Sequence, residues 1–109
     1  MEIGIVYLLC EISDDERFKV GVTNRDIHRR LAELKTGNSH DIHLVNKFES
    51  IHYKKIEKWL HRRYHQFKVN EGGTEWFNLP FNEIVNFENS CKEIEETIIF
   101  MIENNSFYK

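Results

Sequence analysis

The segment FKVGVTNRDIHRRLAELKTG, residues 18–37, decides the fold of this chain. Apolar residues at every second position predict a half-buried strand over 18–23. Apolar residues at helical spacing follow at once and predict an amphipathic helix over 25–36, capped by Asn24 or Asp26. The sequence therefore predicts a strand that turns directly into a helix, with the rest of the chain built around that corner.

Two features of this corner suggest a place to hold a phosphate. Gly21 leaves one point of the strand without a side chain, where a ligand or another backbone can come close. Arg29 and Arg30 lie one turn into the helix, and the helical wheel puts Arg30 nearer the buried stripe. The alternative for this arginine is a surface salt bridge.

The remaining segments complete an α+β fold. The periodicity predicts strands over 3–12 and 42–49, a helix over 51–67 capped by Ser50, an extended segment over 75–79, a short helix over 81–87, and a last helix over 91–104 opened by a Ser90–Glu93 capping box, with turns at 13–16, 39–41 and 70–73. Together these elements predict a small three-stranded antiparallel sheet flanked by helices, in the order β-β-α-β-α, with a C-terminal helical addition. Residues 1–80 are predicted to form the core, and residues 81–109 a helical extension packed on the same domain.

Composition favours an intracellular, soluble, single-domain protein. The chain has 109 residues, 40% apolar and 30% charged, and its longest apolar runs are too short to span a membrane. The opening MEIGIVYLLC contains an acid and no basic segment, so we interpret it as a strand and not as a signal peptide. Two cysteines are too few for a disulfide framework, which favours a cytoplasmic location.

Charge is unevenly distributed along the chain. The net charge is −3, but residues 17–68 hold thirteen of the fifteen Lys and Arg, all six His and only five acids. Both ends of the chain are acidic. A basic middle segment of this kind can face a polyanion. The alternative is two solvated charge faces without a partner.

Four side chains could carry chemistry, and each has an ordinary alternative. Tyr7 lies in the first predicted strand and Lys19 in the second, where a hairpin can place them side by side. Tyr7 could simply be a core residue, and Lys19 could simply point into water. Glu57, with His61 one turn further on, lies in a basic helix, as a surface pair or as one carboxylate ligand of Mg²⁺.

The order of these motifs resembles the GIY-YIG nuclease superfamily. Gly4-Ile5-Val6-Tyr7, then Lys19-Val20-Gly21, then Arg30-Leu31, then Glu57 on a later helix follow the superfamily pattern over residues 3–80. The phage-type branch is more similar, because its second motif begins with lysine and its first helix runs into a segment like Leu34-Lys35-Thr36-Gly37. The resemblance implies metal-dependent hydrolysis of a DNA phosphodiester.

The resemblance also implies roles for individual residues. Tyr7 would handle the proton of the attacking water, Arg30 would bind the scissile phosphate, and Glu57 would hold Mg²⁺ or Mn²⁺. Asn70 would be a supporting residue. A lone phenol is a poor base near neutral pH, and an adjacent Lys19 ammonium would favour the phenolate. Two departures stand out: Lys19 occupies the place of the second-motif tyrosine, and Leu34 occupies a position that is often His or Tyr.

The sequence therefore predicts a small metal-dependent DNA endonuclease, with RNA left open as a substrate and with no membrane partner. The residues expected to contact nucleic acid are Gly21, Arg29, Arg30, Lys35, His61 and Arg62. One alternative is a nucleic-acid-binding module of the same fold that does not cut, and another is a protein-interaction domain. Apolar residues around Ile98 and Ile99 form a surface wider than one core stripe, either buried on the chain's own sheet or paired in a homodimer.

Overall fold

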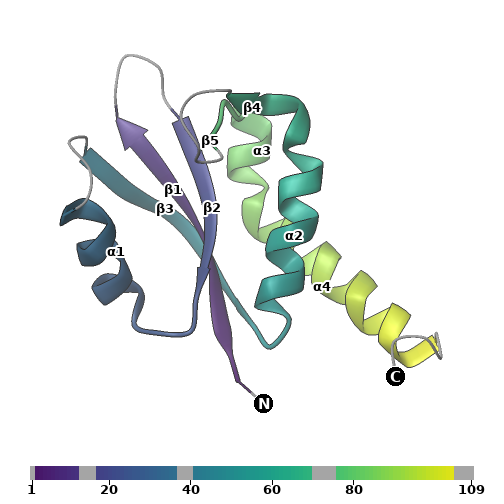
Figure 1. The fold of residues 1–109 in the computed structure, drawn as a ribbon. Coiled ribbons are helices and arrows are strands. Elements are labelled where there is room, and N and C mark those ends of the chain that lie inside the picture. The colour runs from purple at the N-terminus through teal and green to yellow at the C-terminus, as the bar shows by residue number, and fades with distance from the viewer. Residues whose placement is uncertain (1, 13–16, 37–40, 70–75, 105–109) are drawn as a thin grey trace.

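The computed structural model of the chain describes residues 2–12, 17–36, 41–69 and 76–104 (Figure 1). Its strands are β1 (Gly4–Ile12), β2 (Arg17–Thr23), β3 (Asp41–Ser50), β4 (Lys68–Val69) and β5 (Trp76–Phe77). Its helices are α1 (Ile27–Thr36), α2 (Tyr53–Arg63), α3 (Phe81–Val85) and α4 (Phe87–Asn104), with a 3₁₀ turn, η1 (His65–Phe67), after α2. The fold is α+β, as the sequence predicts.

The sheet has five antiparallel strands in the order β3-β1-β2-β5-β4, whereas the sequence predicts three. The three long strands are the predicted ones. The two additional strands have only two residues each, and β5 pairs with β2 at a single position, Phe18 with Phe77. Segments this short show no alternation, so periodicity could not reveal β4 and could indicate β5 only as an extended stretch.

Helices cover both faces of the sheet (Figure 1). On one face, Val6, Leu8 and Val20 pack with residues of α2 and α4 in a single core cluster. On the other face, Tyr7 and Leu9 pack under α1 in a second, smaller cluster, together with Ile27, Ile42 and the partly buried leucines of α1. The sheet thus separates two cores, and the smaller one holds the tyrosine singled out in the sequence.

A β-bulge in β3 decides which side chains share a face with that tyrosine. The register between β1 and β3 shifts between Leu8 and Leu9, because Leu9 pairs with Leu44 while Leu8 pairs with Asn46. The extra residue lets Leu44 reach the core under α1 and Phe48 reach the opposite core, although four residues separate them. The same shift places Lys47 directly opposite Tyr7.

The helix ends differ from the predicted bounds in ways that hydrogen bonds explain. Helix α1 begins at Ile27, and the Asp26 carboxylate accepts the backbone N–H of His28 at 2.8 Å, which confirms Asp26 as the cap. The helix predicted over 51–67 is shorter and Ser50 does not cap it: His52 is the N-cap residue, and residues 51–52 form a turn in which Ser50 Oγ accepts the N–H of His52 at 2.9 Å. Its C-terminal end tightens into η1, so the apolar spacing continues past the α-helix.

The capping box predicted at Ser90 is wrong. Helix α4 begins at Phe87, and Ser90 is buried inside it, donating its N–H to the Asn86 carbonyl at 2.8 Å. Burial of Phe87 in the core brings the helix start forward. Asp41 also differs from its prediction as a loop residue, since β3 begins there. The predicted turns at 13–16 and 70–73, and the first two residues of the turn at 39–41, lie outside the described residues.

Helix α4 packs on α2 and β3, and Cys91, Ile94 and Ile98 join the main core. Burial raises the pKa of the Cys91 thiol to about 12, which makes it an inert core residue. The division of the chain at residue 80 stays a prediction. Within the described ranges, no helix combines the length and the apolar character needed to cross a membrane.

Candidate functional site

Tyr7 lies directly over Gly21. The two residues are cross-strand partners in the β1–β2 hairpin. A side chain added at Gly21 would put its Cβ less than 3.0 Å from the Oη, Cζ and Cε1 atoms of the tyrosine. Only glycine therefore allows the phenol to lie across β2. The space expected above Gly21 exists, and the chain's own tyrosine fills it.

The hydroxyl group of this tyrosine meets Arg30. Arg30 Nε donates to Tyr7 Oη over 3.5 Å, the long end of the hydrogen-bond range. This hydrogen bond, and after it the electrostatic interaction with the same tyrosine, raises the pKa of Arg30. The Arg29 side chain is 74% exposed, against 38% for Arg30. This confirms the prediction from the helical wheel that Arg30 lies nearer the buried stripe. Tyr7 itself is 2% exposed, so it is at once a core residue and a partner of Arg30.

Glu33 is a residue of this corner that the sequence analysis missed. Its carboxylate lies 3.2 Å from Arg25, 4.0 Å from Arg29 and 3.4 Å from Arg30. The spacings of three and four residues along one helix carry the signal for the last two pairs. Three arginines therefore share one carboxylate, so the positive charge at α1 is partly compensated within the chain.

Lys19 lies on the Tyr7 face but not opposite the tyrosine. Its cross-strand partner is Leu9, so the predicted side-by-side pairing is corrected to a diagonal one. Burial lowers the pKa of Lys19, the nearby charge of Arg30 lowers it further, and the charge of Glu57 opposes both. Its Nζ also lies 5.9 Å from the centre of the Trp76 ring. Lys19 is thus half-buried and feels the charges of both Arg30 and Glu57, and it does not simply point into water.

Helix α2 brings Glu57 and His61 to the exposed edge of β2. Because β5 pairs with β2 only at Phe18, the strand edge beyond that point is available to α2. His61 Nε2 lies 3.1 Å from the Val20 carbonyl oxygen, and its ring meets Phe77 edge-on at 5.6 Å. His61 therefore connects α2 to β2, whereas the sequence analysis expected only a contact with nucleic acid.

The described residues contain no group of three or more His, Cys, Asp and Glu side chains that could hold a metal ion. Glu57 is the one predicted carboxylate ligand. Mg²⁺ commonly uses one or two carboxylates together with waters and substrate phosphates, so a single glutamate beside an open surface fits this ion better than zinc. Lys35 and Arg62 are exposed, as expected of residues that contact nucleic acid. Asn70 lies outside the described residues.

Lys47 is a second residue that the sequence analysis missed. It is exposed and shares the sheet face of its cross-strand partner, Tyr7. Only the bulge aims it there, because in a regular strand Leu44 and Phe48 would share a face and Lys47 would point to the opposite one. No pattern in the sequence marks that bulge.

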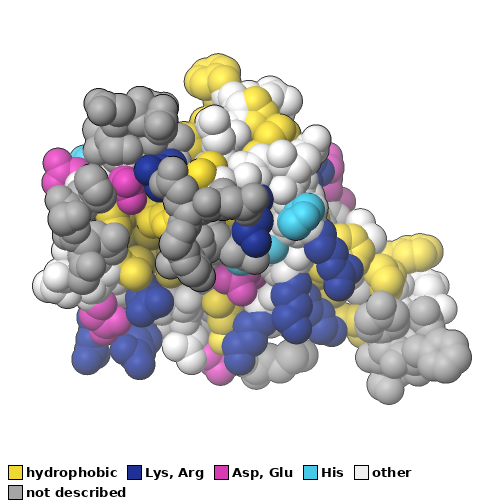
Figure 2. Space-filling view, turned by 45° about the horizontal axis from the view of Figure 1, so that its top comes forward, with side chains coloured by type: hydrophobic (Ala, Val, Ile, Leu, Met, Phe, Trp, Pro, Cys, Tyr) yellow, Lys and Arg dark blue, Asp and Glu magenta, His cyan; other side chains and the backbone are white. Residues whose placement is uncertain are grey.

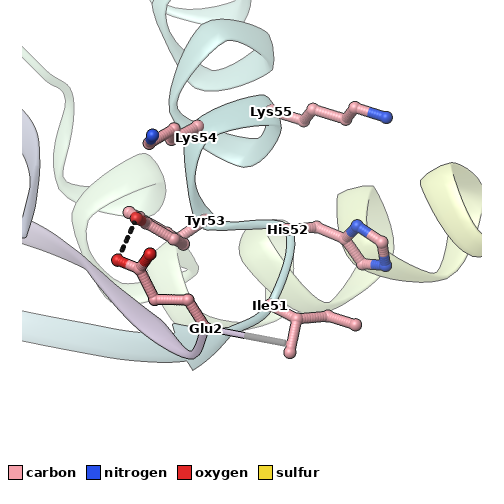
Figure 3. Close-up of a pocket in the computed structure, with 6 residues that line it drawn as sticks. All are labelled: Glu2, Ile51, His52, Tyr53, Lys54 and Lys55. Atoms are coloured by element: carbon pink, nitrogen blue, oxygen red, sulfur yellow. Dashed lines mark hydrogen bonds between the residues drawn. The ribbon is translucent and has the colours of Figure 1, made fainter. Parts of the chain in front are cut away.

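A hollow of about 310 Å³ lies at the start of α2, lined by Glu2, Ile51, His52, Tyr53, Lys54 and Lys55 (Figure 3). In it the Tyr53 hydroxyl donates to Glu2 over 2.9 Å, and Asn24 also donates to that carboxylate. The hydrogen bonds from Asn24 and Tyr53 lower the pKa of Glu2. None of the four predicted catalytic residues, Tyr7, Lys19, Arg30 and Glu57, lines this hollow.

The profile of the T5orf172 domain family matches residues 4–99, which is most of the chain. A protein of Invertebrate iridescent virus 6, described as "Uncharacterized protein 460R", is 30% identical over 112 residues. That alignment covers 96% of this chain and 46% of the viral protein, so the chain spans about half the length of its relative. No solved structure matches the chain significantly.

Proposed function

The chain belongs to the T5orf172 domain family, and we propose that it is a metal-dependent DNA endonuclease with a GIY-YIG-type site. One observation carries the proposal. Tyr7 and Arg30 are in hydrogen-bond contact, Lys19 lies diagonal to Tyr7 on the same sheet face, and the charges of Arg30 and Glu57 both act on Lys19. The order of motifs singles out the same four residues, which supports the proposal. The viral relative fits a protein that acts on nucleic acid.

The geometry suggests how the protein groups would divide the work. Arg30 donates to the Tyr7 oxygen, so the hydroxyl proton of the tyrosine is free to face a substrate or a water. The Tyr7 oxygen, held in place by this contact, would handle the proton of an attacking water. The Nη atoms of Arg30 would hold the scissile phosphate.

The two remaining groups lie on the other side of this pair. Lys19, half-buried beside Arg30, would add positive charge where negative charge develops on the phosphate. Glu57 would hold Mg²⁺, which when bound polarises the phosphate and stabilises the leaving oxygen. The charge of Glu57 already opposes the lowering of the Lys19 pKa, which supports its closeness to this corner.

Nicking of a supercoiled plasmid tests the proposal. We expect wild-type chain to cut in Mg²⁺ or Mn²⁺ and not in EDTA. Glu57→Gln should abolish cutting and leave DNA affinity near wild type, because the variant removes one charge while the basic surfaces stay intact. Equal cutting in EDTA, or full activity of Glu57→Gln, would contradict the metal role.

A non-cleaving nucleic-acid-binding module is the second candidate. Glu33 occupies one donor of Arg30, at 3.4 Å, and Leu34 stands where nucleases often have His or Tyr. Both features favour a corner that binds phosphate without hydrolysing it. DNA binding with no nicking in either metal would support this candidate over the endonuclease.

A further inference from the structure

The exposed side of α2 carries a row of positive charges. Ile56 and Leu60 bury one side of this helix in the main core. On the opposite side Lys54, Lys58 and Arg62 are exposed and follow one another at intervals of four residues, which puts them in one row. Figure 2 shows Lys and Arg side chains gathered in two groups, one on the left where α1 lies and a larger one on the right where α2 lies.

This row works against the stability of its own helix. Like charges four residues apart repel one another. The first turn of α2 holds no acid, and Lys54 faces the positive end of the helix dipole there. Among the described residues no acid forms an ion pair with Lys58 or Arg62. Lys54 lies over the Tyr53 ring, 5.7 Å from its centre. Among the described residues, the repulsion within the row is therefore not offset by an ion pair with Lys58 or Arg62.

Helix α1 differs in this respect. Arg25, Arg29 and Arg30 all lie within 4.0 Å of the Glu33 carboxylate. An anion that approaches α1 must compete with that carboxylate, whereas the described acids form no ion pair with Lys58 or Arg62 of the row on α2. Charge complementarity to a polyanion is thus concentrated on α2.

We infer that the row Lys54–Lys58–Arg62, and not α1, carries the phosphate backbone of duplex DNA past the site. The inference rests on the proposed function for the identity of the polymer. The row extends over nine residues of helix, and the eight steps between its ends correspond to about 12 Å. Over that length one DNA strand carries about three to four phosphates, enough for one per cation. Glu57 and His61 lie beside the row on the same helix, so a backbone lying on it would enter the corner where Arg30 is expected to hold the scissile phosphate.

The test compares two triple variants that remove the same charge. One is Lys54→Gln/Lys58→Gln/Arg62→Gln on α2. The other, called the α1 variant, is Arg25→Gln/Arg29→Gln/Lys35→Gln, on α1 and the segment just before it. Affinity for a labelled duplex of about 20 base pairs is measured by fluorescence anisotropy in EDTA at several salt concentrations. Each lost phosphate contact lowers the salt slope by about 0.9. We expect a loss of about 2 to 3 for the α2 variant and of less than about 1 for the α1 variant.

Equal losses of salt slope for the two variants would show that the row acts only through its net charge. A larger loss for the α1 variant would place the DNA backbone on α1 instead. An unchanged DNA slope with lost binding to phosphatidylserine vesicles would assign the row to a lipid surface instead. Lys58→Gln alone, with an expected loss of about 0.9, replaces the triple variant if circular dichroism shows that the triple is unfolded. EDTA separates binding from cutting. A wild-type chain that binds duplex with a salt slope that the α2 variant loses, but never nicks DNA, would therefore overturn only the proposal that the chain is an endonuclease. A chain that nicks while the α2 variant keeps its slope overturns only this inference, and a chain without affinity for duplex overturns both.

Discussion

Gly21→Ala should stop cleavage without unfolding the protein. The added Cβ would lie less than 3.0 Å from three atoms of the Tyr7 phenol, so the ring must move. The phenol is 2% exposed and packed under α1, which leaves it no free space on that side. Any shift that relieves the clash also changes the position of the hydroxyl relative to Arg30 Nε, where the present contact is already at the long limit of 3.5 Å.

The expected magnitudes separate an effect on the site from an effect on the fold. Overpacking of this kind costs roughly 1–3 kcal/mol of stability. A domain with roughly 5 kcal/mol to begin with would keep about 2 kcal/mol, so the folded form would still exceed the unfolded form about 30-fold. Misplacing a reacting group by about 1 Å, in contrast, can lower a rate about 100-fold. Cleavage should therefore fall far more than the folded population does.

Gly4→Ala supplies the matched control. Its Cβ would meet the ring of Tyr53 as closely as the Cβ at Gly21 meets the ring of Tyr7, but at the start of α2 and outside the corner. Urea denaturation should give similar losses for both variants, and single-turnover cleavage of a duplex should fall about 100-fold only for Gly21→Ala. The two glycines therefore differ in their effect on the rate and not in their effect on the fold.

The same variant in a Tyr7→Phe background tests whether Gly21 acts through the tyrosine. Tyr7→Phe alone should lose most of the activity, and adding Gly21→Ala should cost little more, because both changes affect one group. A folded Gly21→Ala protein that cuts at the wild-type rate would refute the reasoning. Equal rate losses for Gly21→Ala and Gly4→Ala would refute it as well.

Three further expectations follow from the buried and exposed side chains. Burial lowers the pKa of Lys19, so the protonated lysine destabilises the fold, and Lys19→Met should raise the melting temperature at neutral pH. This gain should fade as the pH rises through the lowered pKa toward 10.5, the ordinary value for lysine. The same variant should slow cleavage about tenfold or more. Among the described residues the buried Tyr64 hydroxyl has no hydrogen-bond partner, so Tyr64→Phe should raise the free energy of unfolding, measured with urea, by about 1 kcal/mol. A lower free energy of unfolding would reveal a partner for that hydroxyl. Phe100 is 65% exposed on α4, so sedimentation should show a wild-type dimer at tens of micromolar and a Phe100→Glu monomer, and a monomeric wild type would remove the homodimer.

The hairpin and α1 could be predicted from the sequence because their signals are local. Alternation defines β2, the Asp26 carboxylate caps α1, and the helical wheel separates Arg30 from Arg29. Features that depend on distant partners could not be read in this way. The β3 bulge satisfies two cores at once, and β5 exists only because Phe77 finds Phe18 on a strand far away in the sequence.

Helix starts failed where a local signal competed with packing. Ser90 and Glu93 form a good capping pattern, but the burial of Phe87 contributes more stabilising free energy than the hydrogen bonds of a cap. The helix therefore starts at the phenylalanine and encloses the serine. Site residues were predictable as identities and not as contacts: the motif order indicated Lys19, whereas its diagonal placement beside Arg30 and Glu57 needed the strand register.

The donors of Arg30 are shared in a way that suits a residue which must both anchor and bind. Its Nε donates to the buried Tyr7, and its Nη1 donates to Glu33, whose side chain is 40% exposed. An exposed ion pair of this kind is worth at most about 1 kcal/mol, so a phosphate that accepts two charge-assisted hydrogen bonds can displace the glutamate readily. The contact with the tyrosine is unaffected by that exchange, because it uses a different nitrogen. A phosphate held by the Nη atoms would thus be fixed relative to the Tyr7 oxygen through one rigid, planar guanidinium group, and the distance between proton acceptor and phosphate would not depend on α1 alone.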